Sequence, residues 1–309
     1  MKFLVTGVGG QLGYDVLREL EKRGYEAVGT DLAEEDGRNS YVSMDITDGM
    51  CVRNTLEKIK PEVVIHCAAW TNVDGAEESE NQGKVWSVNV EGTRNLAGMC
   101  RELNAKMIYI STDYVFDGQG NLPWRTDCGQ YGPQNFYGKT KLEGEQAIQS
   151  VLEKYFIVRT AWVFGRNGNN FVKTMLRLGR KNEELRVVCD QIGTPTYTKD
   201  LARLLVDMAE TDKYGCYHAT NEGGYISWYE FATEIFRQAG ELGVMDFDKK
   251  LPNVYPVTTE EYGQSKAFRP LNSRLDRTKL QMAGFQPLPD WKAALRRYLQ
   301  ELGEEGWDR

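Results

Sequence analysis

The first half of the chain alternates short apolar runs with longer amphipathic stretches. The apolar runs predict strands at residues 2–6, 26–31, 41–46, 62–69, 106–112 and 155–164. The amphipathic stretches predict helices, the clearest at residues 11–23, 83–103 and 137–152. Strands that are apolar throughout and separated by helices indicate a parallel sheet covered on both faces. We therefore expect an α/β fold, a Rossmann-like doubly wound parallel sheet.

The pattern loosens after about Gly165, where segments become richer in Gly, Pro and aromatic residues. A final helix is predicted at residues 290–302, and residues 186–191 are expected to return as a strand to the sheet. We expect a dinucleotide-binding domain over residues 1–165, to which some later segments return. Residues 166–309 are expected to form mainly a smaller, discontinuous substrate-binding lobe.

Composition excludes several classes of protein. The 309 residues are 41% hydrophobic and 27% charged, which is ordinary for a soluble globular protein. No run approaches the roughly 18 apolar residues of a membrane span, and glycines interrupt the N-terminus too early for a signal peptide. The net charge of −7 without a long basic run argues against nucleic-acid binding. We expect a cytoplasmic protein.

The six cysteines and two histidines are scattered, without a Cys-x-x-Cys pair. Because metal sites need clustered ligands at short spacing, no metal site is predicted, and the cysteines are expected to be reduced. An anionic substrate would need a few well-placed cations. Arg269 and Lys173 are candidates by charge alone, although both also fit a solvated surface.

A glycine-rich turn follows the first predicted strand. Gly7, Gly10 and Gly13 form a Gly-x-x-Gly-x-x-Gly pattern just before the first helix. Such glycines allow a tight turn and close approach of the backbone to a pyrophosphate, which the N–H groups of the helix N-terminus can bind. The placement favours a dinucleotide site over a simple chain reversal.

Asp31 ends the second predicted strand, 18 positions beyond Gly13. An acid there can accept hydrogen bonds from the adenosine ribose and favours NADH, whereas NADPH usually requires a nearby arginine. Arg38 is the first candidate for that role, so NADPH is not excluded. Asp45 and Ile46 are predicted to flank the adenine. A solvated acid at the strand end is the structural alternative for Asp31.

Tyr137 and Lys141 have the spacing that puts two side chains on one face of a helix, about one turn apart. A tyrosine is a weak acid at neutral pH unless a neighbouring cation stabilises its anion, and Lys141 can supply that cation. Tyr262 and Lys266 repeat the spacing, but between prolines and far from the nucleotide-binding half. We interpret that second copy as a coincidence.

Ser111 and Thr112 close the predicted strand at residues 106–112, and ligand chemistry gathers at the carboxyl ends of such strands. A hydroxyl there can bind a substrate carbonyl oxygen while Tyr137 transfers the proton. Asn89, on the preceding helix, could support Lys141 through a water molecule, with a purely structural role as the alternative.

These residues give the chain a resemblance to the dTDP-4-dehydrorhamnose reductase family of extended short-chain dehydrogenases/reductases, over nearly its full length. The segments that carry the resemblance are residues 6–13, 68–74, 111–118, 137–141, 159–164 and 269–273.

The resemblance implies a catalytic trio of Thr112, Tyr137 and Lys141. It places the NADH or NADPH cofactor against Gln11, Leu12, Asp31, Asp45, Ile46, Ala68, Ala69, Trp70 and Thr71. It assigns the sugar nucleotide to Thr71, Thr112, Asp113 and Trp162, with Arg269 added by charge. Trp70 departs from the family, which often has histidine or tyrosine there. The resemblance also implies a homodimer and a magnesium ion that family members can hold between subunits.

Related sugar-nucleotide dehydratases carry Asp-Glu after the threonine, whereas this chain has Asp113-Tyr114. Elimination therefore loses its base, and reduction of the C4 ketone of dTDP-4-dehydro-L-rhamnose is the expected reaction. Trp162 would offer a stacking face for thymine unless it is packed core. The alternatives are another nucleotide-sugar reductase or epimerase, and a non-catalytic dinucleotide-binding subunit resembling the regulatory partner of methionine adenosyltransferase.

Overall fold

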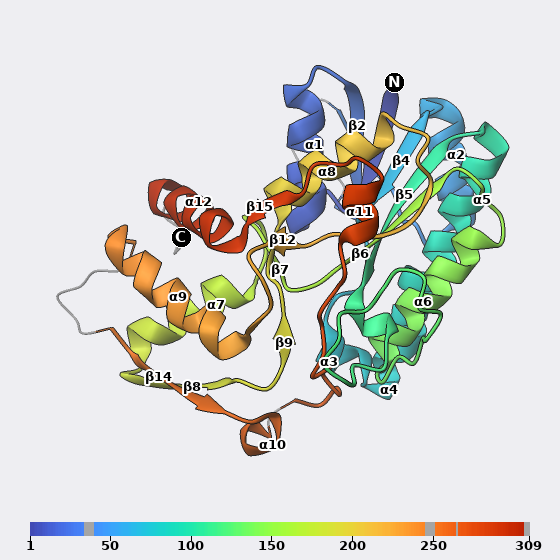
Figure 1. Ribbon diagram of the computed structural model, residues 1–309. Coiled ribbons are helices and arrows are strands. Elements are labelled where there is room, and N and C mark those ends of the chain that lie inside the picture. Colours follow the sequence, from blue (N-terminus) through green and yellow to red (C-terminus); the bar gives the residue numbers. More distant parts are fainter. Residues whose placement is uncertain (34–39, 245–250, 264, 306–309) are drawn as a thin grey trace.

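A parallel sheet of seven strands forms the centre of the molecule, in the order β11-β6-β5-β4-β1-β2-β3 (Figure 1). The computed structural model describes residues 1–33, 40–244, 251–263 and 265–305. The strands are β1 (Lys2–Thr6), β2 (Glu26–Asp31), β3 (Tyr41–Ser43), β4 (Val63–His66), β5 (Lys106–Thr112), β6 (Tyr155–Thr160) and β11 (Gly215–His218). The predicted Rossmann-like fold is confirmed, because every pairing within this sheet is parallel.

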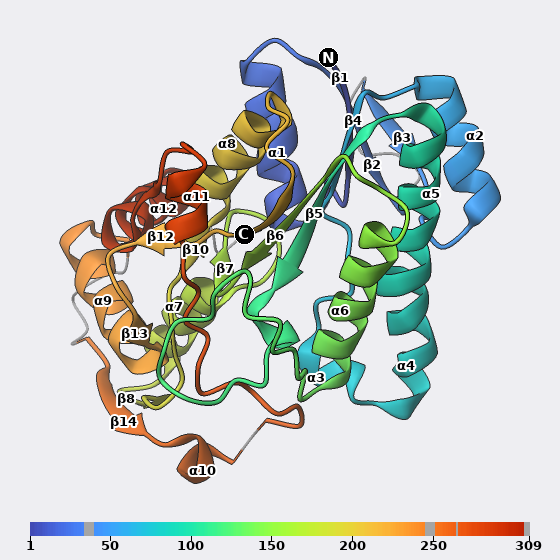
Figure 2. The same ribbon diagram turned by 45° about the vertical axis from the view of Figure 1, so that its right-hand side comes forward.

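Helices cover both faces of the sheet, as Figure 2 shows from the side. One face packs against α1 (Gln11–Lys22) and α8 (Thr198–Ala209), around a core that includes Val16, Leu20 and Leu205. The other face packs against α2 (Gly49–Ile59), α5 (Thr93–Leu103) and α6 (Phe136–Gln149). The remaining elements of this half are α3 (Val73–Ala76), α4 (Ser79–Trp86), a π-helix η1 (Ser87–Gly92) and a 3-10 turn η2 (Asp113–Val115).

A smaller lobe lies beside the carboxyl ends of the strands. Its aromatic-rich core joins α7 (Phe171–Lys181), α9 (Trp228–Glu241) and α12 (Trp291–Glu305). Short strand pairs complete it: β7 (Val163–Phe164) with β10 (Thr196–Tyr197), β9 (Ile192–Gly193) with β13 (Ile226–Ser227), and β12 (Asn221–Glu222) with β15 (Leu288–Asp290). Two short helices, α10 (Thr259–Tyr262) and α11 (Thr278–Met282), lie along the connecting chain.

The expectation that residues 186–191 return to the main sheet is wrong. They overlap β8 (Glu184–Val188), which pairs with β14 (Asn253–Val257) at the edge of the lobe. Leu185 and Val187 are buried in the lobe core, which explains why this run resembles a strand of the main sheet. The strand that does return is β11, which pairs with β6.

The predicted strand at residues 155–164 is interrupted. It divides into β6 and β7, because Trp162 adopts a φ of 52° that turns the chain from the main sheet into the lobe. A non-glycine residue in this left-handed region is strained, and such strain collects at functional sites.

Candidate active site

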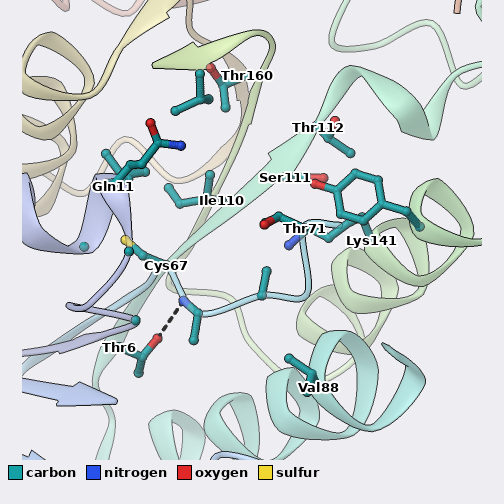
Figure 3. Close-up of a pocket in the computed structure, with 18 of the residues that line it drawn as sticks. Thr6, Gln11, Cys67, Thr71, Val88, Ile110, Ser111, Thr112, Lys141 and Thr160 are labelled. Atoms are coloured by element: carbon teal, nitrogen blue, oxygen red, sulfur yellow. Dashed lines mark hydrogen bonds between the residues drawn. The ribbon is translucent and has the colours of Figure 1, made fainter. Parts of the chain in front are cut away.

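A cavity of about 570 Å³ opens at the carboxyl ends of the central strands, where the lobe meets the sheet. Figure 3 shows Ser111, Thr112 and Lys141 on one side of it and Thr6 and Gln11 on the other. The lining includes most of the residues predicted from the sequence: Gly7, Gly10, Gln11, Leu12, Gly13, Asp31, Asp45, Ile46, Ala68, Ala69, Thr71, Thr112, Asp113, Tyr137, Lys141 and Trp162.

The glycine turn leaves a groove with no room for side chains. A Cβ at Gly7, whose φ is 73°, would lie 2.6 Å from the backbone nitrogen of Ala68, and one at Gly13 would lie 2.2 Å from the Gly7 carbonyl oxygen. Helix α1 begins after Gly10 without a side-chain cap. Its first N–H groups are therefore available to an anion, and the turn fits a dinucleotide pyrophosphate.

Backbone N–H groups of neighbouring turns hold two acids of the cavity lining, Asp31 and Asp45. Asp31 accepts hydrogen bonds from the Gly9 nitrogen (2.8 Å) and the Leu32 nitrogen (2.8 Å). Asp45 accepts from the backbone nitrogen and hydroxyl of Thr47. Both residues line the cavity. Arg38, the candidate for an NADPH phosphate, lies outside the described residues.

A directional chain of hydrogen bonds supports the loop after β4. Thr93 Oγ1 donates to the carbonyl oxygen of Asn89 (2.8 Å), so His66 Nε2, at 3.1 Å, must donate to Thr93. His66 Nδ1 then accepts from Thr6 Oγ1 (2.8 Å), which in turn accepts from the Ala68 nitrogen (3.2 Å). Burial lowers the pKa of His66 to about 3, so the ring stays neutral and connects β1 and β4 to the start of α5.

Asn89 lies in the π-helix η1, a rare distortion that is frequent at functional sites. Its side-chain oxygen accepts from the Trp70 nitrogen (2.8 Å), and its amide donates to the Thr140 hydroxyl (3.0 Å). It therefore ties the Trp70 loop to helix α6. The Trp70 indole donates to the Asn72 carbonyl and is absent from the cavity lining.

Helix α6 presents Tyr137 to the cavity. Asn135 caps the helix by accepting from the Gly138 nitrogen (2.7 Å). A Cβ at Gly138 would lie 2.3 Å from the Tyr114 carbonyl oxygen, so the helix start packs closely against η2. Removal from water raises the pKa of Tyr137, with Asp113 and Tyr114 adding to the rise and the hydrogen-bonded Thr112 hydroxyl opposing it. The phenol is therefore protonated at neutral pH and can act as a proton donor.

Lys141 is buried one turn further along α6, and its ammonium lies 4.0 Å from the centre of the Tyr109 ring. Burial lowers its pKa to about 7, and the negative charge of Glu145 opposes this shift. Asp113, also buried, accepts from Thr112 Oγ1 (3.0 Å), and burial raises its pKa to about 6.

The second tyrosine-lysine pair is different, since Tyr262 ends the short helix α10 and Gly263 follows with a φ of 60°.

Trp162 forms the lobe side of the cavity and stacks on Trp228, with ring centres 3.7 Å apart. Sequence reasoning missed Trp228, because nothing in the pattern of α9 relates it to Trp162.

Arg269 and Lys173, the two candidate cations, are absent from the cavity lining. Arg269 donates to Asp74 (2.6 Å) and the Tyr114 hydroxyl (3.4 Å), and Lys173 donates to the carbonyl oxygens of residues 166 and 168.

Within the described part of the chain, no group of three or more His, Cys, Asp or Glu side chains could hold a metal ion. Among the helices that the structure describes, none is both long enough and apolar enough to span a membrane.

Comparisons with known proteins identify relatives over nearly the whole chain. The family model described as RmlD substrate binding domain matches residues 1–304. A dTDP-4-dehydrorhamnose reductase from Aggregatibacter actinomycetemcomitans is 42% identical, over 96% of this chain and 97% of its own length. The reductase structure from Clostridium acetobutylicum aligns with a TM-score of 0.87 at 41% identity, covering 98% of this chain and 99% of its own. The Bacillus anthracis reductase, solved in complex with NADP, aligns with a TM-score of 0.86 at 40% identity, covering 97% and 100%.

Proposed function

We propose, since the chain belongs to the RmlD substrate binding domain family, that it reduces the C4 ketone of dTDP-4-dehydro-L-rhamnose to dTDP-L-rhamnose with NADH or NADPH. One observation carries the proposal: Thr112, Tyr137 and Lys141 line the same cavity as the glycine turn. The turn lies within residues 1–165. Trp162, where the chain enters the lobe, offers the face for the nucleotide sugar, and the lobe within residues 166–309 backs that face with Trp228.

The bound dinucleotide supplies the hydride. Tyr137 donates its proton to the oxygen at C4 as negative charge develops there. The Thr112 hydroxyl, on turning its proton away from the Asp113 carboxylate, donates a hydrogen bond to the same oxygen. The ammonium of Lys141 stabilises the tyrosinate that remains and can hold a ribose hydroxyl. Asp113 offers its carboxylate to a sugar hydroxyl, and Trp162 offers its ring to the thymine.

The turnover assay separates this proposal from its rivals. We expect the absorbance of NADPH or NADH to fall when dTDP-4-dehydro-L-rhamnose is added. An epimerase would convert its substrate without added dinucleotide, and a regulatory subunit would bind the dinucleotide without consuming it. Either result, with the folded full-length chain, would contradict the proposed reaction.

Trp228 should matter for substrate affinity, because it supports the ring of Trp162 from behind. Trp228→Ala removes that support, and an aromatic pair contributes about 0.5–1.5 kcal/mol beyond its buried area. We expect KM for the nucleotide sugar to rise by up to about tenfold, with kcat and KM for NADPH little changed. Trp228→Phe, which keeps a stacking face, should recover much of the affinity. A rise confined to KM for NADPH would contradict the assignment of Trp162 to the sugar nucleotide.

The proposal extends to the assembly and the location of the protein. The resemblance implies a homodimer that can hold magnesium between subunits. A cytoplasmic location suits the six cysteines, which are free in the structure, since reducing compartments keep thiols unpaired.

A further inference from the structure

A buried ion pair outside the cavity lining joins helix α6 to strand β6. Arg159 on β6 donates through Nε (2.8 Å) and Nη2 (2.6 Å) to the two carboxylate oxygens of Glu145. Their exposed fractions are 0% and 1%. The guanidinium also lies about 5 Å from the ring centres of Phe116 (5.2 Å) and Tyr131 (5.0 Å).

Stability alone is a weak explanation for such a pair. Two charges removed from water pay a desolvation penalty that their attraction only partly offsets, and apolar replacements of similar volume are often as stable. The pair therefore suggests a role in which the position of a negative charge matters.

The spacing along α6 places the Glu145 carboxylate close to the Lys141 ammonium. Lys141 and Glu145 are four residues apart, and both are buried on the face of α6 that packs on the sheet. Gly144 allows α6 to pack closely on β5, since a Cβ at this position would lie 2.4 Å from the Tyr109 hydroxyl oxygen. The Lys141 ammonium lies over that same tyrosine ring.

The other groups that face Lys141 carry no negative charge at neutral pH. His66 on β4 is neutral, because burial lowers its pKa to about 3. Burial raises the pKa of Cys67, which follows β4, to about 12, and the pKa values of Tyr109 on β5 and Tyr137 on α6 are also raised. Among the described residues, Glu145 is thus the carboxylate that acts on the Lys141 ammonium.

We propose that Glu145, fixed by Arg159, is a positioning residue whose carboxylate keeps the buried ammonium of Lys141 charged beside Tyr137 and the cofactor ribose. This rests on the proposed function for its catalytic consequence, but the effect on Lys141 belongs to the chain itself. The sign follows from burial. Lys141 has a lowered pKa and is charged only below it, so loss of Glu145 confines the charged form to more acidic solution.

The test is a pH titration of Glu145→Gln, which keeps the shape of the side chain. We expect the NMR titration of the labelled Lys141 ammonium, assigned with Lys141→Arg, to move to lower pH by about one unit. The alkaline limits of NADPH binding and of kcat/KM should move with it. Glu143→Gln is the matched control, because Glu143 is on the same helix without acting on Lys141, and it should leave all three unchanged.

A second variant guards against unfolding by an unpaired Arg159. Glu145→Gln combined with Arg159→Gln removes both charges, and it should shift the Lys141 titration in the same direction. Folded variants in which Lys141 titrates as in the parent, or in which Glu143→Gln produces an equal shift, would overturn the proposal. If the parent protein lacks turnover, the proposed function fails, while the NMR titration still decides the role of Glu145.

Discussion

Tyr137→Phe is expected to lower kcat by about 10²- to 10⁴-fold, the usual contribution of a positioned general acid. The substitution removes only the phenol oxygen, and the ring keeps its edge-on packing against Tyr114, at 5.7 Å between ring centres. NADPH affinity and thermal stability should therefore change little. Steady-state kinetics together with cofactor binding measured by fluorescence check this directly.

The chain supplies its own control for this experiment. Tyr262 has the same spacing to a lysine, but it ends a four-residue helix with 39% of its surface exposed. Tyr262→Phe should keep parental turnover. Near-normal kcat for Tyr137→Phe would remove Tyr137 from the role of proton donor.

Gly13→Ala is expected to weaken NADPH binding by about 10- to 10²-fold, because overpacking of the turn costs about 1–3 kcal/mol and each 1.4 kcal/mol is a factor of ten in affinity. The new Cβ would lie 2.2 Å from the Gly7 carbonyl oxygen, far below the 3.0 Å that real contacts respect. Because the obstructing atom belongs to the backbone, the dinucleotide turn itself must open. Overpacking of this kind also destabilises a protein by about 1–3 kcal/mol.

Gly98→Ala is the matched control, since a Cβ at this position in α5 meets no atom within 4 Å. It should leave cofactor binding unchanged and stabilise the helix by about 0.5–1 kcal/mol. Calorimetric titration with NADPH distinguishes the two variants. Equal affinity in Gly13→Ala and the parent would show that the turn does not hold the cofactor.

The centre of the sheet was predictable because β1, β4, β5 and β6 are almost entirely buried and are therefore continuous apolar runs in the sequence. The same reasoning failed for residues 186–191, since Leu185 and Val187 are buried in the lobe core rather than in the sheet. Hydrophobicity reports that a strand is buried without specifying which sheet buries it. The division of residues 155–164 at Trp162 likewise depends on a backbone angle that has no sequence signal at a non-glycine residue.

The candidate site was predictable where function follows from local spacing, as in the glycine turn and the pair Tyr137 and Lys141. The hydrogen bonds that support the site from other strands and helices were not predictable. His66 connects Thr6 to Thr93, and Arg159 holds Glu145 across a sequence separation of 14 residues. Such contacts arise only once the strands and helices are assembled. The sequence signals available were the buried charge implied by Arg159 within an apolar strand and the histidine at the end of β4.

The destination of the hydride tests the central claim most directly. The protein is given NADPH in which both hydrogens at C4 of the nicotinamide are deuterium, together with dTDP-4-dehydro-L-rhamnose, and the product is examined by NMR. We expect dTDP-L-rhamnose with deuterium at C4 of the sugar, formed in step with NADPH oxidation. Product without deuterium, deuterium at another carbon, or conversion without dinucleotide oxidation would contradict it.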